Sequence, residues 1–183
     1  MQAASRLRDG LTAAGPTGLS TLGMLYLSAA ISSSSLERST AVVAASTNLV
    51  DEATEVAEQQ GTDLNEDWTA FGPTNVELHR VDVLARLEDG WSALEAANEL
   101  EPEALGGMTR ERQAQHLITM ARVQLLTRHK EGAVKSLVRA DELAPEEVRR
   151  RQSSRDLVED LLGATPVPST ELRALAARCG LRA

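Results

Sequence analysis

Polar side chains recur at helical spacing in two segments of the chain, and their types could bind an extended peptide. In the segment after Pro73 they stand three or four positions apart, which places them on one face of a helix. They are Asn75, His79, Asp82 and Arg86, and the corresponding positions of a later segment hold Gln115, Thr119 and Arg122. Because amide, hydroxyl and guanidinium groups donate hydrogen bonds to carbonyl and carboxylate oxygens, we expect these residues to line a groove. The alternative is that they form only a solvated helix face.

Motifs for catalysis or metal binding are missing from the sequence. It contains no glycine-rich phosphate loop, no Gly-x-Ser-x-Gly elbow, and no His-Glu-x-x-His or paired-cysteine motif. His79, His116 and His129 are too far apart for a local metal motif, so we expect surface or hydrogen-bonded histidines. Cys179 has no adjacent histidine and is expected to be an inert thiol. The sequence therefore predicts a protein that is not an enzyme and holds no metal or cofactor.

The charge of the chain disfavours nucleic-acid binding. A formal net charge of -8 and a pI near 5.0 repel a polyanion, since phosphate recognition needs clustered Lys and Arg. The basic run at 149–151 follows Glu146 and Glu147, and we expect it to complement the dipole at the C-terminal end of a short helix. Lysine occurs only at Lys130 and Lys135 while arginine is common, a bias that we attribute to a GC-rich coding sequence. We expect no direct nucleic-acid binding by this chain.

The sequence favours a cytoplasmic protein. Its single cysteine excludes an intramolecular disulfide and gives no sign of an oxidising compartment. The apolar segment 19–31 is shorter than the ~20 residues that a spanning helix needs, so no membrane association is expected. Arg6 and Arg8 ahead of this segment also fit a signal peptide, but Asp9 and the Gly15-Pro16 break disfavour that interpretation.

The elements that must position the polar residues are helices. Aromatic residues make up only 2% of the chain, so the core must be built from Ala, Leu and Val, which suits close helix packing. Hydrophobic spacing is helical almost throughout and is interrupted by Gly, Pro, Ser and Thr. The polar stretch 62–70 is expected to be a loop. The expected elements are a leading helix at 1–14, a first hairpin at 17–61, a second at 73–101, a third at 110–145, and capping helices at 153–181.

The third hairpin has the spacing of a tetratricopeptide unit of about 34 residues. Its small residues Ala121, Ala133 and Ala140 are expected in the seam between the two helices, where they allow a close approach. An internal similarity between 97–102 and 140–145 supports a repeat. The predicted fold is therefore all-α, with antiparallel helical-hairpin repeats of a tetratricopeptide-like solenoid. The C-terminal helices are expected to cap it with an apolar strip of Leu157, Val158, Leu161 and Leu162.

Two aromatic residues precede the helix at Pro73, and both a structural and a binding role are open to them. Trp68 and Phe71 can act as hydrophobic staples that pack on the first turns of this helix. They can also form the mouth of a binding site. We favour the staple.

Two strings resemble a known family. They are Trp68-Thr69-Ala70-Phe71-Gly72-Pro73-Thr74-Asn75-Val76 with Leu78-His79-Arg80-Val81, and Leu143-Ala144-Pro145-Glu146-Glu147-Val148-Arg149-Arg150. With them, residues 17–181 resemble the C-terminal tetratricopeptide-like region of actinobacterial transcriptional regulators of the xenobiotic-response-element helix-turn-helix type. The resemblance implies a region that senses a ligand or partner. The chain has no room for a helix-turn-helix module before the repeats, so DNA reading is not implied.

These observations predict a sensor or interaction module that binds a ligand, peptide or protein partner. The alternative is a structural module whose repeats make a homodimer interface or a scaffold and hold no small ligand.

Overall fold

The computed structural model describes the backbone of residues 2–66 and 69–182. Side chains are described at residues 6, 8–63 and 71–182. The described chain is predominantly helical, which confirms the all-α prediction, and its helices are α1–α11 in chain order. They form two compact units, Met1–Leu87 and Glu88–Ala183, whereas the sequence pattern predicts a single repeat domain. The boundary between the units falls inside the segment expected to form the second hairpin.

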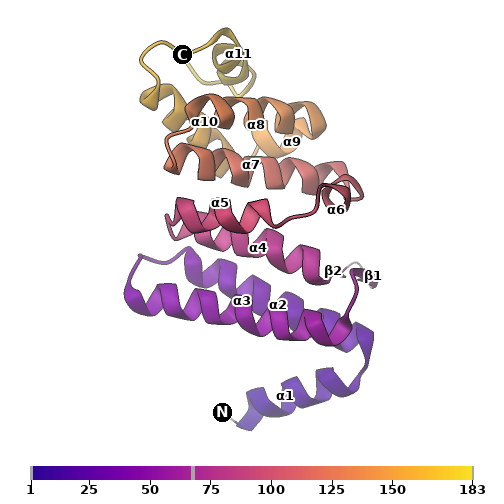
Figure 1. The fold of residues 1–183 in the computed structure, drawn as a ribbon. Coiled ribbons are helices and arrows are strands. Elements are labelled where there is room, and N and C mark those ends of the chain that lie inside the picture. The colour runs from indigo at the N-terminus through magenta and orange to yellow at the C-terminus, as the bar shows by residue number, and fades with distance from the viewer. Residues whose placement is uncertain (1, 67–68, 183) are drawn as a thin grey trace. The chain divides into compact units, whose positions relative to one another are not determined.

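Unit 1 is built around two long helices that lie side by side, α2 and α3 (Figure 1). The signals in the sequence set their ends: Pro16 opens α2, and the Ser39 hydroxyl caps α3 by accepting from the Val42 N–H at 3.2 Å. Gly61 ends α3 in the left-handed region with φ 76°, which a glycine adopts at little cost. The helices of unit 1 are α1 (Gln2–Ala13), α2 (Pro16–Ser34), α3 (Thr40–Gln60) and α4 (Pro73–Arg86).

The core of unit 1 depends on a close approach between Phe71 and Gly23 of α2. A Cβ atom on Gly23 would lie 2.0 Å from Phe71 Cζ, so only glycine leaves room for the ring. Phe71 is buried in the same core cluster as Val76 of the first turns of α4. The structure thus gives Phe71 the packing role that was expected of a staple. Trp68 lies outside the described residues.

The stretch expected to be a loop before α4 contains a short ribbon. Strands β1 (Leu64–Glu66) and β2 (Thr69–Phe71) pair antiparallel, with Leu64 opposite Phe71. Strands this short show no hydrophobic alternation, so the sequence pattern did not reveal them. The described residues contain no other strand.

Polar side chains hold this ribbon to the helices on either side. Gln60 Nε2 donates to the carbonyls of Thr62 and Phe71 at 3.0 and 2.9 Å. The Asp63 carboxylate accepts from the Thr74 N–H at 3.1 Å and from the Thr74 hydroxyl at 2.6 Å, which caps the start of α4. Pro73 occupies the first position of α4, and Gly72 is its N-cap.

Unit 2 contains a second pair of helices that pack together, α7 and α8, followed by three shorter helices (Figure 1). The Thr109 hydroxyl caps α7 and the Ser169 hydroxyl caps α11. The helices of unit 2 are α5 (Gly90–Asn98), α6 (Pro102–Gly106), α7 (Arg110–Leu126), α8 (Lys130–Leu143), α9 (Pro145–Arg149), α10 (Gln152–Ala164) and α11 (Thr170–Arg178).

The predicted alanine seam of unit 2 is buried. Ala121 of α7 and Ala133 and Ala140 of α8 are fully shielded from solvent and belong to one core cluster. The apolar strip of α10 joins the same cluster: Leu157, Val158 and Leu161 are buried and Leu162 packs against them. Among the described residues, no helix combines the length and the apolarity needed to cross a bilayer.

Candidate ligand-binding site

The predicted polar stripe on α4 is largely turned toward its own unit. Asn75 is only 4% exposed and its Nδ2 donates to the sulfur of Met24 at 3.3 Å, so it does not present its amide to a partner. His79 is half-buried, and its Nδ1 lies 2.8 Å from the Asn75 carbonyl oxygen. Arg86 forms an ion pair with Asp82 at 3.1 Å. The expectation of an exposed stripe is therefore wrong for Asn75, because polar periodicity does not tell a solvated residue from a buried, hydrogen-bonded one.

The corresponding stripe on α7 belongs to unit 2 and is also partly buried. Thr119 is 6% exposed, which corrects the expectation that its hydroxyl faces a partner. Gln115 and Arg122 are half-buried, and Gln115 Oε1 is shielded and has no hydrogen-bond partner in the described part of the chain. The neighbouring His116 has a shielded Nδ1, and burial lowers its pKa. The two cavities described below are lined by other residues.

A cavity of about 370 Å³ in unit 2 is a better candidate, and we call it the lysine cleft. It lies between the first turns of α8, the connection from α10 to α11, and the first turn of α11. Its residues are Lys130, Glu131, Val134, Lys135, Thr165, Val167, Ser169, Glu171 and Leu172. Both lysines of the chain are among them.

The two lysines of the cleft are held differently. Lys130 is the first residue of α8, where the helix dipole disfavours a cation. Its Nζ donates to the carbonyl of Ala164, the last residue of α10, which has no acceptor role inside that helix. Lys135 is exposed and has no hydrogen-bond or ion-pair partner in the described part of the chain. Lys130 thus hydrogen-bonds the C-terminal end of α10, and Lys135 remains available to a ligand.

The other residues of the cleft add carboxylates, a hydroxyl and apolar surface. Glu131 and Glu171 are exposed, and within the described residues neither forms an ion pair with a lysine. The hydroxyl of Thr165 is shielded from solvent and has no hydrogen-bond partner among the residues that the structure describes. Leu172 is fully buried beneath the cleft, while Val167 is 82% exposed at its rim. The cleft therefore offers charges of both signs beside an apolar wall.

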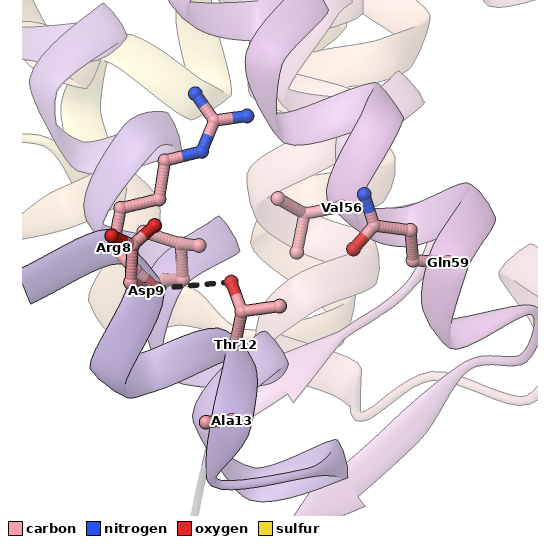
Figure 2. A pocket seen from close by; sticks show the side chains of 7 residues that line it. Arg8, Asp9, Thr12, Ala13, Val56 and Gln59 are labelled. Carbon is pink, nitrogen blue, oxygen red and sulfur yellow. Dashed lines mark hydrogen bonds between the residues drawn. The ribbon is translucent and has the colours of Figure 1, made fainter. Parts of the chain in front are cut away.

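A second cavity, of about 430 Å³, lies in unit 1 between α1, α2 and α3. In Figure 2, residues of α1 lie across it from Val56 and Gln59 of α3. Its cation is already engaged, because Arg8 Nη1 lies 2.9 Å from the Glu52 carboxylate. The Thr12 hydroxyl donates to the Arg8 carbonyl at 2.9 Å, shown as a dashed line. Because its arginine already forms an ion pair, we regard this cavity as the weaker candidate.

The remaining cluster of charged and nucleophilic groups is structural. Asp141 is buried among Arg149, Arg178 and Cys179. Burial raises the pKa of the Cys179 thiol, which agrees with the expectation of an inert cysteine. Among the described residues, no group of three or more His, Cys, Asp or Glu side chains is placed to hold a metal ion.

Comparisons with protein-family models, with curated proteins and with solved structures found no match to the chain. The site therefore has to be judged on its own chemistry. Sequence reasoning missed the lysine cleft, although one signal was present: the lysines occur only five positions apart in a chain that otherwise uses arginine. Their cleft partners at 165–172 are remote in sequence, so their proximity came only from the fold.

Proposed function

We propose that this chain is a ligand-binding module built from tetratricopeptide-like helical hairpins, with the lysine cleft of unit 2 as its binding site. One observation carries the proposal: the cleft gathers cations and carboxylates that, in the described part of the chain, do not pair with each other, and it places them beside an apolar wall. Binding sites for small molecules combine apolar walls with a few polar groups that fix the orientation of the ligand.

The tetratricopeptide part of this proposal is supported by the alanine seam of α7 and α8 and by the sequence spacing that predicted it. The similarity to the sensory region of bacterial regulators makes signalling a reasonable role for such a module. In that role, ligand binding would alter how the helices of unit 2 pack, and a separate protein would respond.

The proposal is tested by a thermal-shift screen of small metabolites. A ligand that binds the folded state raises the unfolding midpoint, because at 100 times its Kd it stabilises that state by about 2.7 kcal/mol. We expect at least one class of compound to raise the midpoint of the wild type and of Arg139→Gln, but not that of Lys135→Gln. Arg139 is a matched control, since it lies one turn further along α8 in an exposed ion pair with Glu142. A shift retained in Lys135→Gln, or no shift with any compound, would refute the proposal.

A protein contact is the second candidate function, and an exposed tryptophan favours it. Trp91 near the start of α5 is 72% exposed, and Leu126 of α7 is 39% exposed. Gly90, the residue before Trp91, packs against Leu126, because a Cβ atom on Gly90 would be 2.8 Å from Leu126 Cβ. Tryptophan is enriched at the centres of protein interfaces. Light scattering of the wild type and of Trp91→Ala tests self-association: a dimer that dissociates in the variant supports this function, and a monomeric wild type excludes a homodimer.

A further inference from the structure

We infer that the lysine cleft takes a free aliphatic α-amino acid, recognised through its carboxylate, its ammonium group and its side chain together. This inference rests on the proposed function, because it names the ligand of the same site. It is the ligand class that uses every kind of group in the cleft.

The arrangement of charge is the first argument. Lys135 is an exposed cation without a partner, and Glu131 and Glu171 are carboxylates without a partner among the described residues. A purely anionic ligand would be attracted to the lysine and repelled by both glutamates. A zwitterion satisfies both signs, since its carboxylate can pair with the lysine while its ammonium group pairs with a glutamate.

The ends of two helices strengthen the carboxylate side. The cleft contains the first turns of α8 and α11, which are long enough to carry a positive partial charge at their N-termini. Ser169 caps the Leu172 N–H at 3.2 Å, and the earlier N–H groups of α11 have no acceptor within the helix.

The apolar wall and the volume of the cleft indicate which ligand side chain fits. Val134, Val167 and Leu172 form the part of the cleft without charge, and the exposed Val167 side chain gains burial when a ligand covers it. A cavity of about 370 Å³ lies at the lower end of the range for small-molecule sites. The cleft therefore fits a branched aliphatic side chain better than a second charged group.

The test measures binding of L-leucine by isothermal titration calorimetry and compares it with analogues that each lack one group. These are 4-methylpentanoate without the ammonium group, 3-methylbutylamine without the carboxylate, and glycine without the side chain. We expect each analogue to bind at least 10-fold more weakly than L-leucine. Equal binding of L-leucine and 4-methylpentanoate would overturn the inference, because the glutamates would then recognise nothing.

Variants assign the groups of the ligand to the residues of the cleft. Lys135→Gln should bind L-leucine and 3-methylbutylamine equally, because it no longer senses the carboxylate. Glu171→Gln should reduce the preference for L-leucine over 4-methylpentanoate at least 3-fold. The controls Arg139→Gln and Glu142→Gln make the same charge changes in an exposed ion pair of α8 and should keep the wild-type preferences. Unchanged preferences in both cleft variants would place the amino acid elsewhere and refute the inference.

Two further comparisons complete the test. One separates a free amino acid from the end of a peptide, and the other separates failure of this inference from failure of the proposed function. In the dipeptides Gly-Leu and Leu-Gly the ammonium group and the carboxylate are further apart, and both should bind at least 10-fold more weakly than L-leucine. Tighter binding of either dipeptide would indicate that the cleft binds a peptide end and would overturn the inference of a free amino acid.

If no amino acid binds but another metabolite raises the unfolding midpoint of the wild type and not that of Lys135→Gln, the inference fails and the proposed function stands. If nothing binds, both fail.

Discussion

Arg149 holds Asp141 through two parallel hydrogen bonds. Its Nε lies 2.6 Å from one carboxylate oxygen and its Nη2 lies 3.0 Å from the other. Arg178 Nε adds a third bond at 2.8 Å, so a side chain that is only 4% exposed joins α8, α9 and α11. Arg149 also ends α9, where the sequence pattern expected the basic run to complement the helix dipole. The structure adds this long-range partner, which the local charge pattern could not reveal.

Replacing Asp141 with Asn should therefore destabilise unit 2. The amide keeps the shape but loses the charge that both guanidinium groups need, and hydrogen bonds to charged groups contribute about 1.5–3 kcal/mol each. Because the arginine side chains are partly exposed, we expect a net loss of about 1–3 kcal/mol in the free energy of unfolding, measured by urea denaturation. Glu142→Gln, the next residue on α8 and an exposed one, is the control and should change stability by less than about 0.5 kcal/mol. Equal losses in the two variants would contradict the role of the cluster.

The same cluster predicts a dependence of stability on pH. Burial by itself raises the pKa of Asp141, but hydrogen bonds and charge from Arg149 and Arg178 outweigh it and hold the pKa below its ordinary value. A carboxylate with a lowered pKa in the folded state stabilises that state above its unfolded pKa of about 3.9. This contribution is lost as the pH falls through the lowered pKa.

The difference in unfolding free energy between the wild type and Asp141→Asn should accordingly be constant from about pH 5 to pH 8 and shrink below about pH 4. Urea denaturation of both proteins at pH 7, 5 and 3 measures it. A difference that is the same at pH 7 and pH 3 would show that the charge of Asp141 is not what the arginines stabilise.

The alanine seam predicts the effect of a larger side chain. Ala133 is fully shielded between α7 and α8, so Ala133→Leu should overpack the seam and destabilise the protein by roughly 1–3 kcal/mol. Thermal unfolding followed by circular dichroism measures the change in midpoint. Ala174→Leu on the exposed face of α11 is the matched control and should leave the midpoint nearly unchanged. An unaltered midpoint for Ala133→Leu would show that the seam can open to accept the added atoms.

The contact between Gly23 and Phe71 predicts a coupled pair of substitutions. Alanine usually stabilises a helix relative to glycine, by up to about 1 kcal/mol. At Gly23, however, the new Cβ would stand 2.0 Å from the Phe71 ring, and we expect Gly23→Ala to destabilise unit 1 by roughly 1–3 kcal/mol. Gly10→Ala in α1 is the control, because nothing lies within 4 Å of its added atom.

Adding Phe71→Leu should relieve part of that clash, so the two substitutions together should cost less than the sum of the single ones. A double-mutant cycle by urea denaturation gives the coupling. Strict additivity would mean that α2 moves away from the ring and that the close approach is not maintained in solution.

Local signals in the sequence determined most of the helices and several of their ends, but the short helix α6 lies between the expected hairpins and was not predicted. Pro16, Ser39, Gly61 and Ser169 act within one helical turn, through a fixed φ, a capping oxygen or a left-handed residue, so their effect can be read from neighbouring positions. The alanine seam was predictable for a similar reason, because helical periodicity alone brings small residues onto one face.

Only the tertiary structure decided which polar residues are buried and which segments meet. Asn75 and Thr119 follow the same polar periodicity as exposed residues, yet packing within their units covers them. The lysine cleft forms because α11 packs on α8 and brings residues 165–172 beside Lys130 and Lys135. Segments so far apart in the chain share no local pattern. Their proximity depends on the burial of apolar surface such as Leu172 in a common core, which is a property of the whole unit and not of any short stretch of sequence.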